Sequence, residues 1–404
     1  MKSATRWMNW NGCWDCKADK NAERKMWKKE SGSIRVCGDE NMEKVKLSDI
    51  CNPKQWKTIP TGDLLDEGYP VYGANGIIGY YSEYNHETPV VAVTCRGATC
   101  GSLNITVPNA YVTGNAMCLD EVRNDVNINY LYYCLKHYDF NNIISGSAQP
   151  QITRQGMDKI FISICCHDKQ CEIVDRLKKI ENVIDLRKRE IVLLDNLIKA
   201  RFVEMFGDPV SNPYGYDKVA LSDLADIKIG PFGSLLHKED YIEGGHPLLN
   251  PSHIVDGKIS PDDKLTISDE KYEELSAYQL KIGDVVMGRR GEMGRCAVVP
   301  KDGFLCGTGS IIIRTKGEVT PDYIQKIISF PSFKKIIEDM AVGQTMPNLN
   351  VPIVSRFQII KPPMEVQDRY YKLVAQITKS KVAVQKALDE AQLLFDSLMQ
   401  QYFG

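Results

Sequence analysis

The chain has 404 residues, of which 43% are hydrophobic and 25% are charged. This length predicts two or three domains with cores of their own, and this composition excludes wholesale disorder. Fifty Lys and Arg residues oppose 52 Asp and Glu residues, and the formal net charge of −2 excludes a protein that coats nucleic acid indiscriminately. No apolar run approaches the ~20 residues of a membrane-spanning helix, and we expect a cytoplasmic protein.

The first segment, residues 1–41, has no clear periodicity. It carries nine Lys or Arg residues against six acidic residues, and four of the five tryptophans of the chain. Met42 and the residues after it resemble the natural start of a protein. We therefore expect residues 1–41 to be an N-terminal extension that is poorly ordered and contributes little to the fold.

The 13 cysteines are mostly scattered singly, as is typical of a protein from a reducing compartment. Two clusters bear on metal binding. Cys13-x-x-Cys16 has the spacing of half a zinc site, and the segment 165–171 holds three cysteines and a histidine. Structural zinc requires four ligands that converge tetrahedrally; the first cluster has no second pair, and the second lies where a strand runs into a helix. We therefore expect buried or unreactive thiols and predict no metal site.

Two globular regions are predicted, at residues 42–167 and 207–365. Both contain short apolar runs with strand character, such as 89–93 and 310–313, separated by Gly, Asn and Pro. Short helices are predicted after them, at 128–138 in the first region and 321–339 in the second. The expected fold class is α+β with sheets rich in antiparallel pairs.

A long helix is predicted after each region, at 168–206 and 366–404. Apolar residues recur alternately four and three positions apart for about five heptads, which is typical of coiled-coil packing. Such a helix would extend roughly 50 Å at ~1.5 Å per residue. The alternative is a charged helix with one face on a single globule. The predicted seam residues are Ile173, Leu177, Ile180, Ile191, Leu194 and Ile198 in the first helix, and Val374, Ile377, Val384, Leu388, Phe395 and Leu398 in the second.

The order of these elements results from an internal duplication. The ordered matches are 46–50 with 220–224, Arg96 with Arg290, 150–152 with 347–349, and Gln170 with Gln367. Both long helices also end in Phe-Gly. The chain is therefore expected to contain two similar domains and two similar helices that pack against each other.

Motifs of DNA-modifying enzymes are missing from the sequence, including the Pro-Pro-aromatic loop of amino-methyltransferases and the P-loop of ATP motors. One loose pattern, from Pro261-Asp262 to Lys271, matches magnesium-dependent nucleases, which need two carboxylates and a lysine around the metal. Asp262 is expected in a turn, however, and Ser268 is expected to be the N-cap of a short helix. We predict no catalytic residue, with a nuclease as the weaker alternative.

Several short segments complete the pattern. They are 46–50 (Lys-Leu-Ser-Asp-Ile), 69–76 (Tyr-Pro-Val-Tyr-Gly-Ala-Asn-Gly), 149–152 (Gln-Pro-Gln-Ile), 230–234 (Gly-Pro-Phe-Gly-Ser) and 346–349 (Met-Pro-Asn-Leu). Together with the ordered duplication over 42–404, they resemble the DNA-specificity subunit of type I restriction–modification systems.

The resemblance implies that 42–167 and 207–365 are target recognition domains. It also implies that the two helices form an antiparallel coiled coil, which acts as a spacer and as a docking surface for two methyltransferase subunits. A motor-nuclease restriction subunit would join the full complex. S-adenosylmethionine is expected on the methyltransferase subunits and no cofactor on this chain. The family offers no role for 1–41.

Candidate DNA-binding residues lie in the loops that join the short strands, because base reading requires bidentate groups such as Arg and Asn. They are Tyr72, Asn75, Tyr80, Arg96, Asn115, Ser234, Lys238, Asn250, His253, Arg289, Arg290 and Arg295. Tyr80 suits a core or rim position equally well. Arg96 and Arg290 occupy equivalent places, which suits a shared phosphate contact or a structural bridge at least as well as base reading.

The charge of each region predicts weak DNA binding by the chain alone. Nine basic residues oppose 12 acidic residues in 42–167, and 18 oppose 22 in 207–365. Acidic domains attract phosphate poorly, so tight binding to a bipartite double-stranded DNA site should require the partner subunits. A coiled-coil scaffold whose globular regions bind protein or polysaccharide is the alternative function.

Overall fold

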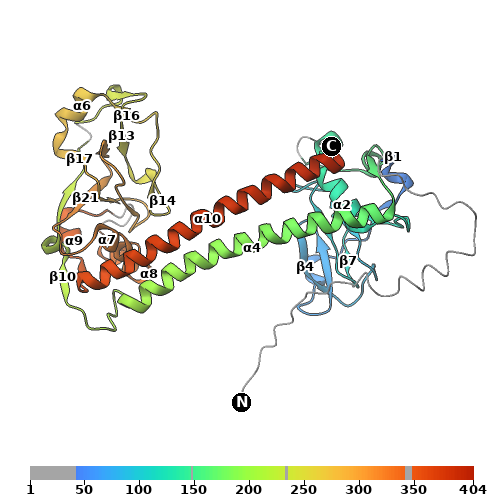
Figure 1. Cartoon of the computed structure of the whole chain (residues 1–404), viewed down its shortest axis with the longest axis horizontal. Helices are drawn as coiled ribbons and strands as arrows, with labels where there is room; N and C mark the ends of the chain where they lie inside the picture. Colours follow the sequence, from blue (N-terminus) through green and yellow to red (C-terminus); the bar gives the residue numbers. More distant parts are fainter. Residues whose placement is uncertain (1–41, 147–148, 233–234, 342–347) are drawn as a thin grey trace, which may run out of the picture. The chain divides into compact units, whose positions relative to one another are not determined.

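The computed structural model describes residues 42–146, 149–232, 235–341 and 348–404 (Figure 1). The predicted extension 1–41, with Cys13 and Cys16, and the candidate Ser234 lie outside the described residues. Two compact units divide the chain: unit 1 takes in the described part of Met1–Lys179 together with Phe395–Gly404, and unit 2 takes in that of Ile180–Leu394. Within the described ranges, no helix is long and apolar enough to cross a membrane.

Unit 1 contains two sheets and a two-stranded ribbon. The antiparallel four-stranded sheet has the order β2 (Asn52–Gln55), β8 (Ala116–Asp120), β5 (Val91–Thr94) and β6 (Leu103–Ile105). The three-stranded sheet has the order β4 (Gly76–Tyr81), β3 (Tyr69–Gly73) and β7 (Tyr111–Val112), in which β3 and β7 are parallel. The ribbon pairs β1 (Glu43–Lys46) with β9 (Phe161–Ile164). The helices are α2 (Ile128–His137), α3 (Arg154–Met157) and the 3-10 turns η1 (Leu47–Asp49), η2 (Thr61–Asp63) and η3 (Phe140–Asn142).

Unit 2 has two larger sheets and two ribbons. The four-stranded sheet has the order β11 (Ala225–Ile229), β21 (Ser310–Thr315), β18 (Val285–Gly288) and β19 (Cys296–Val298). The five-stranded sheet has the order β12 (Tyr241–Ile242), β16 (Thr266–Ile267), β13 (His246–Leu249), β20 (Phe304–Cys306) and β17 (Gln279–Leu280). The ribbons are β10 (Lys218–Ala220) with β22 (Gln358–Ile360), and β14 (Ile254–Val255) with β15 (Lys258–Ile259). The helices are α5 (Leu221–Leu224), α6 (Asp269–Glu274), α7 (Pro321–Ile328), α8 (Pro331–Met340), α9 (Val351–Ser355), η4 (Lys238–Asp240), η5 (Pro251–His253) and η6 (Ser276–Tyr278).

The two units repeat one topology. The ribbon β1–β9 corresponds to β10–β22, and the sheet β2-β8-β5-β6 corresponds to β11-β21-β18-β19. The parallel pair β3–β7 corresponds to the parallel pair β13–β20. Unit 2 adds β12 and β17 at the edges of its second sheet, the hairpin β14–β15 and the helices α6 and α8. The predicted α+β fold with two similar domains is confirmed.

One predicted helix is two helices. The sequence predicts a single helix over 321–339, whereas α7 ends at Ile328 and α8 begins at Pro331. Phe330 is extended (φ −70°, ψ 136°) because the proline ring crowds the residue before it out of the helical region, and Pro331 has no N–H for a helical hydrogen bond. The predicted N-cap Ser268 is confirmed, since its side chain accepts from the Lys271 N–H.

A buried glutamine joins the start of each long helix to its own unit. The long helices are α4 (His167–Phe206) and α10 (Met364–Phe403). In unit 1, Gln170 Oε1 accepts from the Asn127 N–H at 2.7 Å, and its Nε2 donates to the Cys165 carbonyl at 2.8 Å. In unit 2, Gln367 makes the equivalent bonds at 3.0 Å, to the Thr320 N–H and the Pro362 carbonyl. Both glutamines are fully buried. Their side-chain amides therefore provide the hydrogen bonds that these backbone N–H and C=O groups no longer make with water.

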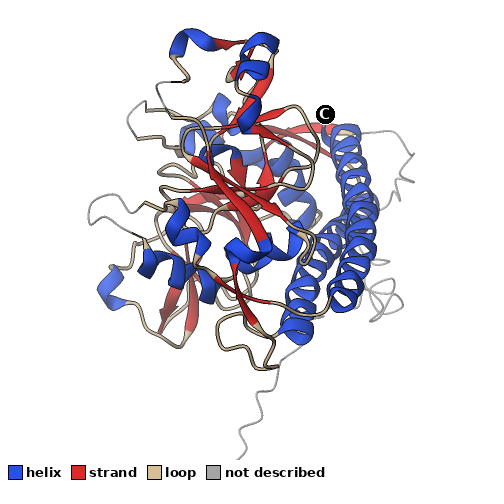
Figure 2. Cartoon of the chain, turned by 90° about the vertical axis from the view of Figure 1, so that its left-hand side faces the viewer, coloured by secondary structure: helices blue, strands red, loops and turns tan. Residues whose placement is uncertain are grey.

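Within unit 2, α4 and α10 run antiparallel and lie side by side (Figures 1 and 2). Lys381 Nζ contacts both carboxylate oxygens of Asp195, at 2.6 and 2.7 Å. Further along, the Tyr370 hydroxyl donates to the Ile198 carbonyl at 3.4 Å, and its ring packs edge-on against Phe202. Higher numbers on α4 therefore meet lower numbers on α10. In unit 1, Arg176 near the start of α4 donates to the Tyr402 hydroxyl near the end of α10 at 3.2 Å.

The seam of these helices is covered to different degrees along its length. Every predicted seam residue is either buried or half-buried. Ile173, Leu177, Ile377, Val384 and Phe395 are buried, whereas residues such as Leu194 and Leu388 are half-buried. Two helices alone leave part of a heptad seam in water, because each side chain has neighbours on one side only.

We expect Gln367→Leu to lower the free energy of unfolding of the chain by about 3 kcal/mol, because leucine leaves the Thr320 N–H and the Pro362 carbonyl buried without partners. Thermal denaturation followed by circular dichroism measures the loss. Gln376→Leu, at an exposed position of the same helix, is the matched control and should change stability by less than about 0.5 kcal/mol. Equal stability of the two variants would contradict the role given to Gln367.

Candidate nucleic-acid interface

Two equivalent loops carry exposed arginines. Arg96 follows β5 in unit 1, and Arg290 follows β18 in unit 2. Each forms a β-bridge with the segment that precedes the last short helix, Arg96 with Gln151 and Arg290 with Asn348. Neither guanidinium is held in an ion pair by the described residues, in contrast to many other cations of the chain. Both charges are therefore available to a phosphate or to a base edge.

The glycine after each arginine shapes the loop. Gly97 and Gly291 have φ values of 89° and 80°, in the left-handed region that residues other than glycine rarely adopt. A Cβ at either glycine would meet no atom within 4 Å, so the requirement is conformational and does not come from a close packing contact. The glycines turn the chain and leave the preceding arginine at the loop surface.

The backbone around these loops is the same in both units. The Ile152 N–H donates to the Cys95 carbonyl at 3.0 Å, and the Leu349 N–H donates to the Arg289 carbonyl at 2.9 Å. Cys95 and Arg289 therefore occupy equivalent positions. By the same comparison Asn115 corresponds to Gly309, since their carbonyls accept from the N–H groups of Cys95 and Arg289, both at 3.0 Å.

Arg289 and Arg295 already have partners in unit 2. Arg289 is half-buried and its Nε donates to Asn348 Oδ1 at 3.1 Å; burial, and then the charge of Arg290, lowers the pKa of its guanidinium. Arg295 binds Glu292 at 2.6 Å. Hydrogen bonds from Arg295 and then Lys334 hold the pKa of the Glu292 carboxyl below its ordinary value.

A cavity of about 360 Å³ lies beside Arg295 in unit 2. Its wall includes Lys326 from α7 and Lys334 from α8, and Lys334 Nζ contacts Glu292 at 3.1 Å. Sequence reasoning missed these lysines because they lie more than 30 residues beyond Arg295, and no spacing links them to it. Lys326 and Lys334 add positive charge beside Arg295.

The prediction that Tyr72 contacts DNA is wrong. Its side chain is only 7% exposed and lies in a core cluster with Val90 and Val112. Its hydroxyl accepts from the Val107 N–H at 3.2 Å, so the polar end of the ring is also engaged inside the domain. A tyrosine on a short strand was indistinguishable in sequence from one at a surface, because strand faces alternate and the register was unknown.

Asn250 and His253 cap a 3-10 turn. The Asn250 side chain accepts from the His253 backbone, and His253 Nδ1 contacts the Asn250 N–H at 3.3 Å and the Leu248 carbonyl at 2.8 Å. These side chains organise their own loop, and their DNA contact stays a prediction.

The remaining candidates differ in exposure. Asn75 is exposed at the turn between β3 and β4, and Tyr80 is 37% exposed on β4. Asn115 is half-buried beside the Arg96 loop. For Lys238 the structure describes the backbone alone, in η4. DNA contact by these residues also stays a prediction.

The metal-ligating side chains converge at another place. Among the described residues, His86, Cys118 and Asp120 form the one group whose ligand atoms could hold a metal ion together. The sequence did not suggest this group, because its members are spread over 35 positions without a recognised spacing.

The model of the family described as "Type I restriction modification DNA specificity domain" matches the chain twice, at residues 39–196 and 213–391. The chain belongs to this family. The type I restriction enzyme EcoprrI specificity subunit of Escherichia coli is 27% identical over 115 residues, which are 28% of each chain. The type I restriction enzyme MjaIX specificity subunit of Methanocaldococcus jannaschii is 21% identical over 294 residues, or 67% of each chain.

Solved structures share the fold. The S subunit of a type I restriction–modification system from M. genitalium covers 92% of this chain with 98% of its own length, at 15% identity and a TM-score of 0.59. A chain from a structural study of the assembly of the type I system covers 92% with 99% of its own length, at 14% identity and a TM-score of 0.58. At this identity the likeness establishes the architecture and leaves the base contacts open.

We expect Arg96→Ala and Arg290→Ala each to weaken DNA binding of the assembled complex by about 1–3 kcal/mol, because each removes an exposed charge without an internal partner. Fluorescence anisotropy at a series of salt concentrations measures the change. A lost phosphate contact reduces the salt slope by about one, whereas a lost base contact relaxes the preference at one position.

Arg123→Ala is the matched control, because this arginine is already paired with Asp125 at 2.7 Å in unit 1. It should leave binding unchanged. Wild-type affinity in both the Arg96 and the Arg290 variants would remove the two loops from the interface.

Proposed function

We propose that this chain recognises a bipartite, asymmetric sequence in double-stranded DNA and directs the methyltransferase and restriction subunits of a type I system to it. The carrying observation is the pair of equivalent loops in two units of one topology, each presenting an exposed arginine at the same backbone position. Two related readers in one chain address two half-sites, as paired recognition elements do in dimeric DNA-binding proteins.

We expect the half-sites to differ because equivalent positions carry different side chains, although Cys95 is buried and Arg289 also donates to Asn348. Cys95 in unit 1 is replaced by Arg289 in unit 2, and Asn115 is replaced by Gly309. An amide can pair with adenine, whereas a guanidinium pairs with guanine, and cysteine or glycine offers neither pattern. The two units are thus suited to different bases.

This chain contributes recognition to the complex, and catalysis belongs to its partners. In α6, the lysine of the nuclease-like pattern, Lys271, binds Glu274 at 3.1 Å on its own helix, and Asp262 accepts from the Lys264 N–H in a turn. Both groups have local structural roles. S-adenosylmethionine is assigned to the methyltransferase subunits, and the complex is assigned to the cytoplasm, where its DNA substrate lies.

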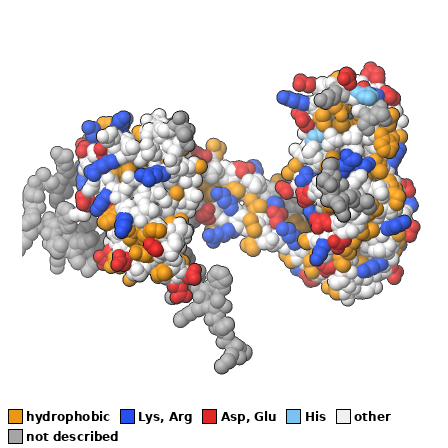
Figure 3. Space-filling view, turned by 180° about the vertical axis from the view of Figure 1, so that it is seen from behind, with side chains coloured by type: hydrophobic (Ala, Val, Ile, Leu, Met, Phe, Trp, Pro, Cys, Tyr) orange, Lys and Arg blue, Asp and Glu red, His pale blue; other side chains and the backbone are white. Residues whose placement is uncertain are grey.

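The charge distribution supports DNA binding by this chain together with its partner subunits. Basic and acidic side chains are interspersed on the face of both units shown in Figure 3, in keeping with the near-neutral charge of the chain. Because acidic side chains accompany the basic ones, we expect the chain to release few counterions when it binds a duplex. Two methyltransferase subunits, one for each recognition domain, supply the missing contacts.

Exposed apolar side chains on the long helices provide a surface for these partners. Leu186 and Leu193 on α4 are 61% and 66% exposed, and Val382 and Leu393 on α10 are 66% and 72% exposed. All four lie within unit 2, outside the predicted seam. A subunit that covers them would complete the half-buried packing of the helix pair.

We expect Leu193→Lys to impair assembly with the methyltransferase subunits while the melting temperature of the chain stays unchanged, because the side chain is exposed. Its neighbour Leu194→Lys places a charge in the half-buried seam and should lower the free energy of unfolding by about 2 kcal/mol. Size-exclusion chromatography and thermal denaturation separate the two effects. Normal assembly of the Leu193 variant would place the partner elsewhere.

We expect the purified chain to bind its DNA site about a hundredfold more weakly than the complex with methyltransferase subunits does, because the partners hold the duplex from further points. The chain is co-expressed with these subunits and DNA methylation is mapped in the host, which should reveal one bipartite asymmetric motif. The same subunits without this chain are the control. Methylation without a motif, or equal affinity of the isolated chain, would contradict the proposal.

A further inference from the structure

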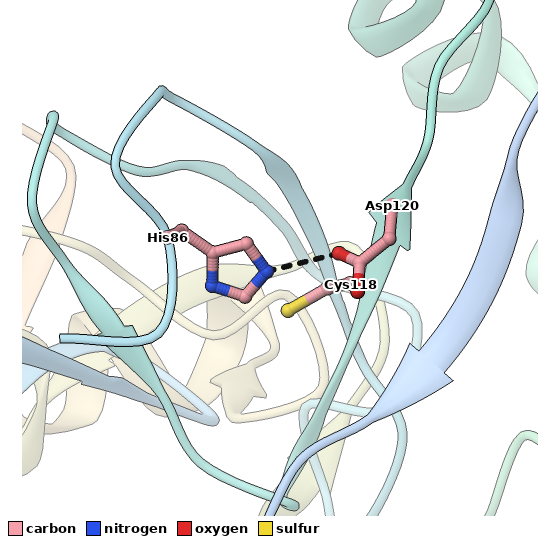
Figure 4. A group of neighbouring side chains, drawn as sticks. All are labelled: His86, Cys118 and Asp120. Atoms are coloured by element: carbon pink, nitrogen blue, oxygen red, sulfur yellow. Dashed lines mark hydrogen bonds and ion pairs between the residues drawn. The ribbon is translucent and has the colours of Figure 1, made fainter.

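Three side chains of different chemistry converge in unit 1 (Figure 4). Cys118 and Asp120 lie two residues apart on β8, so their side chains leave the same face of the strand. His86 approaches from the loop before β5, and its Nε2 lies 2.9 Å from Asp120 Oδ1. The His nitrogen, the Cys sulfur and a carboxylate oxygen all lie within 4.8 Å of one another.

Neighbouring groups fix the orientation of the histidine. The amide of Asn85 is held by Val112: its Nδ2 donates to the Val112 carbonyl at 3.0 Å, and its Oδ1 accepts from the Val112 N–H at 2.9 Å. The amide therefore presents Oδ1 to His86 Nδ1, at 2.6 Å, and this nitrogen carries the hydrogen. Nε2 then faces Asp120 Oδ1.

The carboxylate of Asp120 is also oriented. Its Oδ2 accepts from Trp56 Nε1 at 3.1 Å, and its Oδ1 is left facing His86. At this distance the two groups share a cation, which is either a proton on Nε2 or a metal ion that replaces that proton. Metal-ligating histidines have this arrangement, with one nitrogen toward the metal and the other donating to a polar partner.

Unit 2 places its own cation at the corresponding position. Asp120 pairs with Asn52 in β8–β2, and Arg314 pairs with Asp226 in the equivalent β21–β11. The Arg314 guanidinium binds the buried Asp284 carboxylate at 2.6 Å. Unit 1 has a carboxylate where unit 2 has this guanidinium, and the partner of that carboxylate is His86.

We propose that His86, Cys118 and Asp120 bind a zinc ion in unit 1. Nitrogen, sulfur and oxygen donors of this set suit zinc, and a water molecule can fill the fourth tetrahedral position. His86 and Asp120 are about one-tenth exposed, which leaves room for that water, and Cys118 is fully buried. Burial raises the pKa of the Cys118 thiol, so zinc binding releases the thiol proton to solvent.

The site would act as a clamp inside the recognition domain. Asn85, beside His86, is bonded to Val112 of β7 in the three-stranded sheet, whereas Cys118 and Asp120 belong to the four-stranded sheet. Zinc would tie the two sheets together at the start of β5, since Cys118 is paired with Ala92. The inference concerns metal binding and does not depend on the proposed DNA recognition.

Elemental analysis of the purified full chain, after dialysis against zinc and removal of excess metal, should give one zinc ion more per chain than in Cys118→Ser. Asp120→Asn keeps the shape of the side chain and should also lose this ion. Cys134→Ser is the matched control, because Cys134 is a buried cysteine of the same unit outside the group. Cys171→Ser tests the cluster at 165–171, and it should keep the ion.

Cobalt gives a second measurement, in which the wild-type chain itself reports a thiolate ligand. Wild-type chain loaded with cobalt should show a thiolate-to-cobalt charge-transfer band, which Cys118→Ser lacks and Cys134→Ser retains. Zinc content equal in wild type and in both ligand variants would overturn the proposal, as would a cobalt band that persists in Cys118→Ser. A proton would then be the cation between His86 and Asp120.

Discussion

A buried glutamine at the start of each long helix fixes that helix to its own recognition domain. Gln170 and Gln367 bridge the N-terminus of a short helix and the backbone just before the long one, and both are fully buried. Each backbone group that lost its partner would remain desolvated, so the junction resists bending. Base reading requires side chains held within about 0.5 Å of their hydrogen-bonding geometry, and a loose junction would remove that precision.

The two units share one backbone arrangement and differ in the side chains that it carries. Backbone hydrogen bonds define the arginine loops in both units, and such bonds do not depend on side-chain identity. Cys95 and Arg289 can therefore exchange at one position, and Asp120 and Arg314 at another, while the sheets keep their order. This separation of frame from surface explains how a duplicated gene can produce two unlike readers in one chain.

Charge is organised locally in this protein. Many arginines and lysines are neutralised by acids within a few residues, as Arg295 is by Glu292, and the long helices cross-link through Lys381 and Asp195. Such pairs add little to stability at an exposed surface, and each one neutralises a cation that could otherwise meet phosphate. Arg96 and Arg290 are distinguished by their equivalent places in the two loops, and the proposed dependence on partner subunits has an electrostatic reason.

The duplication, the two long helices, their apolar seams and the α+β class followed from the sequence by itself, because periodicity and repetition are properties of neighbouring positions. Tertiary structure alone decided that Tyr72 is buried and that His86 meets Cys118 and Asp120. The sequence also predicted one helix across Pro331, because the apolar pattern continues on both sides of the proline, although the helix breaks there. Contacts between residues tens of positions apart depend on strand register and loop paths, and one sequence contains no direct record of either.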